Sequence, residues 1–172
     1  KKEIDRLDRL VGEFLRFARP TAPLRANVDL NEIVESVATL VEQQAASQSV
    51  TVVRNLNHNI PVVFVDAEQI RQVLLNLAIN GLQAMTQTIE KPNFLTFRTF
   101  QQDSRLVVEI GDSGTGIEIQ NVSKVFDPFF TTKDNGVGPG LSIAHKIAMQ
   151  HGAVLNVRSD ATGTIFSLTF AR

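Results

Sequence analysis

The sequence predicts an α+β fold with a mixed β-sheet, because its strand-like and helix-like segments neither alternate regularly nor form a pure β pattern. Apolar residues recur at helical spacing over 29–41 and 66–87, and a further helix is expected at 141–150. Shorter strand-like segments lie at 51–56, 62–65, 94–100, 106–110, 154–158 and 164–170. We expect the strands at 94–100 and 106–110 to pair antiparallel.

Residues 1–19 have the pattern of a helix in a bundle or coiled coil. A narrow apolar seam at spacings of three and four is formed by Ile4, Leu7, Val11, Phe14 and Ala18. An isolated helix of this length is marginal in water, so the seam predicts a partner helix, with packing on its own domain as the alternative. Two prolines in 20–27 predict a linker, and a second domain is expected over 28–172. The chain starts without methionine inside a helical pattern, as a part of a longer protein would.

The helix that begins after Asp66 separates its residues into two sides, and Gln69 suits a capping box at its start. The apolar side holds Ile70, Val73, Leu74, Leu77, Gly81 and Ala84. An arc of about 80° on another side holds amides, namely Gln72, Asn76, Asn80, Gln83 and Gln87. Amides can coordinate a hard cation through oxygen and still tolerate nearby phosphates. A polar face exposed to solvent is the alternative.

Composition limits the classes of function. The chain has 172 residues and 43% hydrophobic content, which is sufficient for one compact domain with a short appendage. Its net charge of -1, from 17 basic and 18 acidic residues, argues against nucleic-acid or membrane-surface partners. It has no cysteine, which excludes disulfides and thiolate metal sites, and it has no apolar run of the roughly 20 residues that cross a bilayer.

A glycine-rich segment follows the strand at 106–110. Its first motif is Asp112-Ser-Gly-Thr-Gly-Ile117. An aspartate at a strand end can accept a hydrogen bond from an exocyclic amine, and Gly114 and Gly116 let the backbone approach a flat ring. An ordinary turn is the alternative, since Asp and Gly are common turn residues.

Two further motifs complete this segment. Phe126-Asp-Pro-Phe-Phe130 places three aromatic residues where they can anchor a mobile loop or fill the core. Gly136-Val-Gly-Pro-Gly-Leu141 lies directly before a helix, whose exposed N–H groups and dipole attract an anion. The motif lacks the Gly-Lys-Ser/Thr ending of a Walker loop and the strand–turn–helix setting of a dinucleotide site.

In their order along the chain, four motifs resemble the N, G1, F and G2 boxes of sensor histidine kinases. They are Asn76-x-x-x-Asn80, Asp112-x-Gly-x-Gly116, Phe126-x-Pro-Phe-Phe130 and Gly136-x-Gly-x-Gly-Leu141. The resemblance covers nearly the whole chain and includes His151-Gly152 and Gly163-Thr164-x-Phe166. The run Phe129-Phe130-Thr131-Thr132-Lys133 resembles the nitrogen-regulation type of these kinases.

The resemblance implies the Bergerat ATP-binding fold of gyrase, Hsp90 and MutL-type ATPases, a two-layer α/β sandwich in which helices cover one face of the sheet. ATP is expected under a lid formed by residues 119–135, braced by Phe126, Phe129 and Phe130. By this likeness Asn76 binds Mg²⁺ that bridges the phosphates, while Asp112 and Thr164 contact adenine. The other residues expected at ATP are Asn80, Gln83, Gly114, Gly116, Ile117, Lys133, Gly136, Gly138, Gly140 and Leu141.

The resemblance also implies a protein-histidine kinase that transfers the ATP γ-phosphoryl to a histidine and then to the receiver domain of a response regulator. Residues 1–19 resemble the second helix of the dimerisation and phosphoacceptor hairpin, so a homodimer through that hairpin is expected. The acceptor is missing, because His58, His145 and His151 lie outside any His-Glu/Asp motif. His145 is expected on a helix surface and His151 at a helix end. The expected location is cytoplasmic, alone or as the cytoplasmic part of a membrane-bound sensor.

Some residues depart from the family pattern. Gln72 stands where the related ATPases carry a glutamate that activates water, so independent ATP hydrolysis should be weak. Val137 and Pro139 replace a common threonine and leucine, and Pro139 lacks an N–H that would face phosphate, which predicts altered nucleotide affinity. A nucleotide-binding pseudo-kinase and a true ATPase of this superfamily therefore remain as alternatives.

Overall fold

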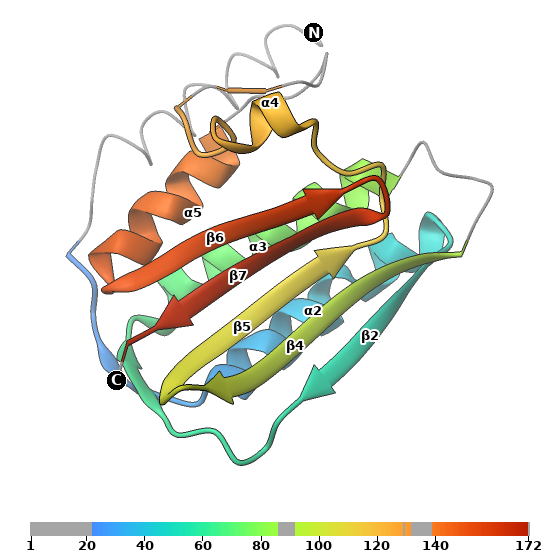
Figure 1. Ribbon diagram of the computed structural model, residues 1–172. Helices are drawn as coiled ribbons and strands as arrows, with labels where there is room; N and C mark the ends of the chain where they lie inside the picture. The colour runs from blue at the N-terminus through green and yellow to red at the C-terminus, as the bar shows by residue number, and fades with distance from the viewer. Residues whose placement is uncertain (1–21, 86–91, 129, 132–138, 172) are drawn as a thin grey trace, which may run out of the picture.

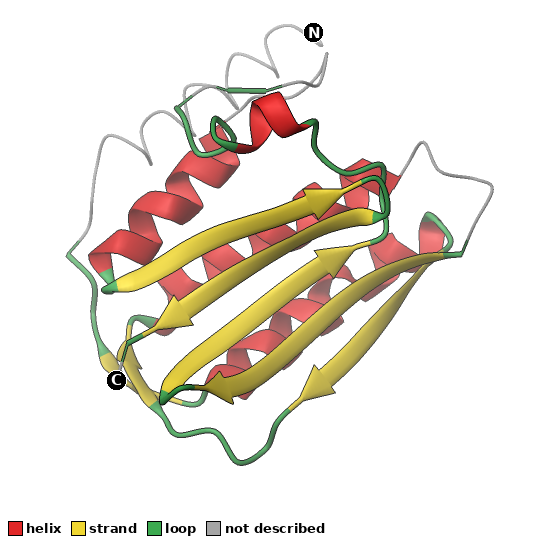
Figure 2. Cartoon of the chain, in the orientation of Figure 1, coloured by secondary structure: helices red, strands yellow, loops and turns green. Residues whose placement is uncertain are grey.

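The computed structural model describes residues 22–85, 92–128, 130–131 and 139–171. In chain order these residues form β1 Ala26–Val28, α2 Leu30–Ser47, β2 Val50–Leu56, β3 Val63–Val65, α3 Ala67–Met85, β4 Asn93–Gln102, β5 Arg105–Asp112, α4 Ile119–Val122, α5 Pro139–Gln150, β6 Ala153–Asp160 and β7 Gly163–Phe170. One layer is a sheet, and α2, α3 and α5 form a second layer that covers one of its faces (Figures 1 and 2). This arrangement confirms the predicted α+β sandwich.

The main sheet is mixed, as predicted. Within the described residues it has five strands in the order β2-β4-β5-β7-β6. Strands β2 and β4 run parallel, while β4–β5, β5–β7 and β6–β7 pair antiparallel. A separate antiparallel pair joins β1 to β3, with Ala26 opposite Val65. Strand β1 is not predicted from sequence, and two of its residues, Ala26 and Asn27, come from the expected linker.

Several elements are longer than the sequence suggests. Strand β6 runs to Asp160 and β7 begins at Gly163, so the turn between them is shorter than the expected turn over 159–163. Helix α5 begins at Pro139, two residues before the expected start, which places Gly140 in its first turn. Proline is accepted there because the first helical positions have no N–H partner within the helix.

Aspartates cap the first two long helices. Asp29 Oδ1 accepts a hydrogen bond from Asn31 N at 2.8 Å at the start of α2. Asp66 Oδ1 accepts from Glu68 N and Gln69 N at 3.0 and 3.1 Å at the start of α3. These bonds satisfy N–H groups that lack an intrahelical acceptor, which explains why both helices begin directly after an aspartate.

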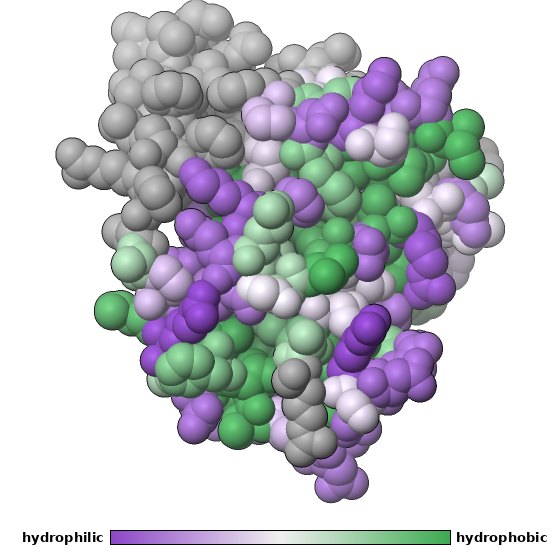
Figure 3. All heavy atoms as spheres, turned by 60° about the vertical axis from the view of Figure 1, so that its left-hand side comes forward, coloured by the Kyte–Doolittle hydropathy of each residue, from purple (hydrophilic) through white to green (hydrophobic). Residues whose placement is uncertain are grey.

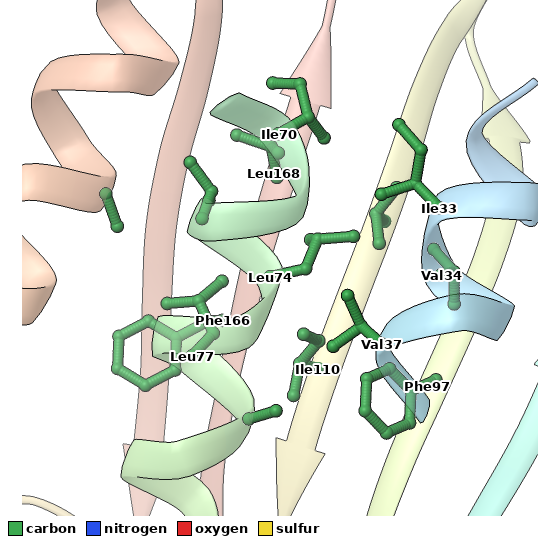
Figure 4. Close-up of a cluster of buried hydrophobic side chains, with 14 of the residues drawn as sticks. Ile33, Val34, Val37, Ile70, Leu74, Leu77, Phe97, Ile110, Phe166 and Leu168 are labelled. Atoms are coloured by element: carbon green, nitrogen blue, oxygen red, sulfur yellow. The ribbon is translucent and has the colours of Figure 1, made fainter. Parts of the chain in front are cut away.

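The hydrophobic core lies between the helix layer and the sheet. Figure 4 shows Leu74 and Leu77 of α3 directed toward side chains of the strands, among them Ile110 and Phe166. Leu74 is fully buried, and Phe97 of β4 fills the space on the α2 side. Because α3 lies over the middle of the sheet, its position relative to β5 and β7 is fixed by this packing.

The face that includes α5 and the β6 edge carries apolar residues in patches between hydrophilic ones (Figure 3). Exposed apolar residues of these two elements include Met149 of α5 and Val154 of β6. Over the described part of the chain, no helix has both the length and the apolar character needed to span a bilayer.

We expect Leu74→Ala to reduce the free energy of unfolding by about 2–5 kcal/mol, because the truncated side chain leaves a cavity between α3 and the sheet. Leu40 lies on α2 with 62% of its surface exposed, so Leu40→Ala should change stability by less than about 0.5 kcal/mol. Urea unfolding followed by circular dichroism measures both variants. Equal losses would contradict the placement of the core.

Candidate functional site

The carboxylate of Asp112 lies at the end of β5 against helix α3. A Cβ added to Gly81 of that helix would be 3.2 Å from Asp112 Cβ and 3.0 Å from Leu95 Cδ1. Contacts this short leave little room for a side chain at position 81. The glycine therefore lets the helix approach the strand end closely enough for Asp112 to line the space beside α3.

The segment after Asp112 folds back on its side chain. Gly114 N donates to Asp112 Oδ1 at 2.9 Å. A Cβ at Gly114 would lie 2.8 Å from that same oxygen and 2.9 Å from the carbonyl oxygen of Ala84. One oxygen of the half-buried carboxylate is thus oriented by the loop, and the loop itself passes directly over α3.

Thr164 stands opposite Asp112 in the β5–β7 pairing and is 2% exposed. Its hydroxyl is 2.9 Å from Ser159 Oγ, which also accepts from Ile117 N at 2.8 Å and donates to Gly163 O at 3.1 Å. Because Ser159 has a single hydroxyl proton and gives it to Gly163, the Thr164 hydroxyl donates to Ser159. Sequence reasoning placed Ser159 in a turn and missed this role, which depends on strand register.

Two glycines allow the backbone segments here to touch. Gly116 has φ +77°, and a Cβ on it would lie 1.8 Å from Asp160 O. A Cβ on Gly163 would lie 1.9 Å from Asp112 O. The G1-like segment and the β6–β7 turn are therefore in direct backbone contact, and this brings Asp112, Gly114, Gly116, Ile117 and Thr164 together.

A second group of residues joins α3 to the start of α5. Asn76 Nδ2 donates to Gly140 O at 3.0 Å, and Asn80 Nδ2 donates to Asn76 O at 2.8 Å. A Cβ on Gly140 would come within 3.9 Å of Asn80 Nδ2. Asn76 and Asn80 are half-buried, whereas Gln83 is exposed. The amide stripe is consequently more than a solvent-exposed face, at least at its two asparagines.

An aromatic contact attaches the loop after α4 to the domain. The Phe126 ring stacks on His145 of α5, with centroids 5.0 Å apart, and meets Phe166 of β7 edge-on at 6.4 Å. Phe130 is half-buried, and its N–H bonds Asp127 O at 3.2 Å. His145 was expected on the helix surface; it is half-buried under Phe126, a contact that helical spacing does not reveal.

The remaining expected site residues divide between two places. Leu141 packs against the core from the first turn of α5. Outside the described residues lie Phe129, Lys133, Gly136 and Gly138, together with Val137. The helix expected at residues 1–19 also falls outside them.

One helix therefore positions both groups of residues. Asn76 and Asn80 face α5, and Gly81 and Ala84 contact Asp112 and its loop. From Asn76 to Ala84 the helix rises about 12 Å, at about 1.5 Å per residue. At one end of the site, the amides of Asn76 and Asn80 lie beside the N–H groups at the start of α5. At the other end, the carboxylate of Asp112 and the hydroxyl of Thr164 lie beside glycine backbone that carries no side chain. Those two ends suit an anionic group and a hydrogen-bonding ring, respectively.

Comparison with known proteins agrees with this geometry. The family described as histidine kinase-, DNA gyrase B-, and HSP90-like ATPase matches residues 65–172. The sensor histidine kinase ZraS of Escherichia coli K12 is 34% identical over 168 residues, covering 97% of this chain and 35% of that protein. Sporulation kinase C of Bacillus subtilis is 30% identical over 168 residues, covering 96% of this chain and 38% of its own length. The chain spans about a third of the curated relatives that it matches.

Solved structures share the fold. The catalytic domain of histidine kinase ThkA aligns with a TM-score of 0.75 at 26% identity, covering 85% of this chain and 94% of that domain. Full-length ShkA in complex with AMPPNP aligns with a TM-score of 0.85 at 24% identity, covering 98% of this chain and 36% of that one. ThkA in complex with the response regulator protein TrrA aligns with a TM-score of 0.80 at 24% identity, covering 98% and 48%.

Gly116→Ala should disrupt the contact between the G1-like segment and the β6–β7 turn. Its Cβ would overlap Asp160 O, so we expect a loss of about 2–4 kcal/mol in unfolding free energy and faster exchange of the Ile117 amide proton. Gly152 also has positive φ, but a Cβ there meets nothing within 4 Å. Gly152→Ala should cost only about 1–2 kcal/mol from its left-handed backbone and leave the Ile117 amide unchanged. Denaturant titration and hydrogen exchange measure both effects, and equal behaviour of the two variants would contradict the contact.

Proposed function

Since this chain belongs to the family of histidine kinase-, DNA gyrase B- and HSP90-like ATPases, we propose that it is the ATP-binding catalytic domain of a sensor histidine kinase. In this role it binds ATP and donates the γ-phosphoryl to a histidine on a dimerisation hairpin, from which a response-regulator aspartate receives it. The observation that carries the proposal is that α3 holds Asn76 at one end of the site and abuts Asp112 at the other.

We assign recognition of the base to Asp112 and Thr164. A carboxylate accepts hydrogen bonds only, so it pairs with an exocyclic amine such as that of adenine and opposes a carbonyl at the same position. The bond from Gly114 N anchors the carboxylate through Oδ1, and the glycines after it let a ring approach the backbone. Thr164, opposite Asp112 on β7, gives its hydroxyl proton to Ser159, so its oxygen can accept a hydrogen bond from the same edge of the base.

We assign the phosphates to the amide end. Asn76 uses Nδ2 to hold Gly140 O, which directs the amide so that Oδ1 is its cation-binding atom. An amide oxygen is a neutral ligand, and Asn76 Oδ1 would hold Mg²⁺ together with phosphate oxygens of ATP. When bound, Mg²⁺ neutralises charge on the transferred phosphoryl group. The residues present fit that role without adding negative charge beside the phosphates.

The main contribution of this chain to phosphoryl transfer is to position ATP. Asp112 and the surrounding glycines set one end of ATP, and Asn76, Asn80 and the first turn of α5 set the other. Gln72 on the same helix is an amide and cannot take a proton from water, which disfavours an independent ATPase. The chain's own histidines occupy other places: His58 is exposed in the turn after β2, while His145 and His151 contact other residues. The phosphoryl acceptor is therefore sought on the hairpin.

Asp112→Asn should lower affinity for an Mg-ATP analogue by about 10- to 100-fold, since a charge-assisted hydrogen bond to the base is worth about 1.5–3 kcal/mol. The substitution replaces one oxygen by a donor that opposes the amine. Asp103→Asn, in the turn at the opposite end of β5, is the control and should bind as the unchanged chain does. Isothermal titration calorimetry measures the affinities. Unchanged binding by Asp112→Asn would contradict the assignment of Asp112 to recognition of the base.

With radiolabelled ATP and a separately supplied acceptor hairpin, we expect label to appear on the hairpin while free phosphate is released slowly. Binding without transfer would instead indicate a nucleotide-binding pseudo-kinase. Rapid phosphate release without a labelled hairpin would indicate an ATPase.

Pro139→Leu restores a backbone N–H at the start of α5 and should raise nucleotide affinity; equal affinities would show that Pro139 has no such effect.

A further inference from the structure

A partly buried set of hydrogen bonds joins residues 22–25 to the start of α3 and the end of α5, away from the nucleotide site. We call Leu24, Asp66 and His151 the linker clamp. Leu24 N donates to Asp66 Oδ2 at 2.8 Å across 42 residues, and Asp66 N donates to His151 Nε2 at 3.1 Å across 85 residues. Asp66 is 9% exposed. None of these links is local, so the clamp exists only in the folded domain.

The hydrogen bonds define the state of the histidine. His151 Nε2 accepts from a backbone N–H, while Nδ1 is 2.8 Å from the carbonyl oxygen of Ile147, which can only accept. Nδ1 therefore carries the proton and the ring is neutral. A ring in this tautomer bridges the last turn of α5 to the first residue before α3.

The carboxylate of Asp66 serves two segments at once. Oδ1 caps α3 through Glu68 and Gln69, and Oδ2 holds Leu24. Burial alone would raise its pKa, but hydrogen bonds from the backbone N–H groups of Gln69, Leu24 and Glu68 lower the pKa below the ordinary value. The group therefore stays ionised near neutral pH and accepts all three bonds.

The segment before β1 is held by hydrogen bonds and not by burial of the Leu24 side chain. The side chain of Leu24 is 86% exposed. The next residue, Arg25, donates from its guanidinium to Gln150 O, beside His151. Strand β1 then starts at Ala26, whose partner Val65 adjoins Asp66. Three consecutive residues thus fix the direction of the chain where it meets the domain.

The clamp and the nucleotide site occupy opposite ends of the same two helices. Asp66 precedes α3, which carries Asn76 about 15 Å further along, and His151 follows α5, which carries Gly140 in its first turn. The two helices are joined by the bond from Asn76, at the middle of α3, to Gly140 in the first turn of α5, and by the bond from Asp66, before α3, to His151, after α5. Any rotation of the segment at residues 22–25 relative to the nucleotide site must break or strain the clamp.

We propose that His151 is a positioning residue, which acts through Asp66 to fix the direction of residues 22–25 and thereby aims the bound nucleotide at the acceptor histidine. This inference rests on the proposed function. It predicts that the clamp raises the rate of phosphoryl transfer when the acceptor lies in the same protein, connected through residues 22–25. The clamp has little effect on this rate when the acceptor is a separate molecule, because no covalent link then directs the acceptor toward the nucleotide.

Two variants separate this role from general stability. Asp66→Asn keeps an oxygen that caps α3 but turns an NH₂ toward Leu24 N. Only the hydrogen bond between residue 66 and Leu24 N is then lost. Asp29→Asn is the matched control, since Asp29 caps α2 in the same way and its cap bond reaches only Asn31. His151→Phe removes both ring bonds at similar size, and His151→Gln restores an acceptor near the position of Nε2.

In this chain we expect Asp66→Asn to speed hydrogen exchange of the Leu24 amide about tenfold, and to leave the affinity for an Mg-ATP analogue within about twofold. In the full-length protein at saturating ATP, Asp66→Asn and His151→Phe should slow transfer to the attached acceptor by about tenfold or more. Transfer to a separate hairpin should be unchanged, and His151→Gln should recover part of the rate. Asp29→Asn should match the unchanged protein throughout.

Equal loss of transfer to attached and separate acceptors would overturn the proposal, because the clamp would then act through the fold of the site. Unaltered transfer to the attached acceptor, despite faster exchange at Leu24, would overturn it as well. If the unchanged protein neither binds nucleotide nor labels an acceptor, the proposed function itself fails; exchange at Leu24 still reports whether the clamp exists.

Discussion

The contact between Gly81 of α3 and Asp112 at the end of β5 sets how closely the helix layer approaches the sheet. Leu95 and Asp112 occupy the volume that a side chain at position 81 would need. With the helix seated at this depth, its apolar side meets Leu168 and Ile110, and its polar side faces α5. The core and the candidate site are consequently two sides of one helix, and neither can shift without the other.

The candidate site depends on backbone contacts as much as on side chains. Gly116 touches Asp160 O, Gly163 touches Asp112 O, and Gly140 leaves space beside Asn80. Each of these glycines lies where a Cβ would separate two chain segments or narrow the space between the helices. These contacts hold the hydrogen-bonding groups around Asp112 rigidly. Phe126 attaches the loop after α4 to the domain by stacking on His145.

Helices α3 and α5 contact both the candidate nucleotide site and residues 22–25. From the middle of α3 the amide of Asn76 bonds the first turn of α5 beside the expected phosphates, and at the start of α3 the carboxylate of Asp66 holds residues 22–25. A helix pair joined at these two places transmits the direction of residues 22–25 to the nucleotide as a rigid body. This geometry suits an enzyme whose catalysis is positioning, because the distance from donor to acceptor is then set by the fold.

The sequence by itself determined the helices α2 and α3, the antiparallel pair of β4 and β5 and the order of the four motifs, because helical spacing, strand alternation and capping aspartates are local properties. It also identified Asn76, Asp112 and Thr164 as candidates. Only the tertiary structure decided the parallel pairing of β2 with β4, the short strand β1, the role of Ser159 and the stacking of His145 under Phe126. The link from Asp66 to His151 is of the same kind. These features depend on residues far apart in the chain, and packing of the core, which local periodicity does not encode, brings them together.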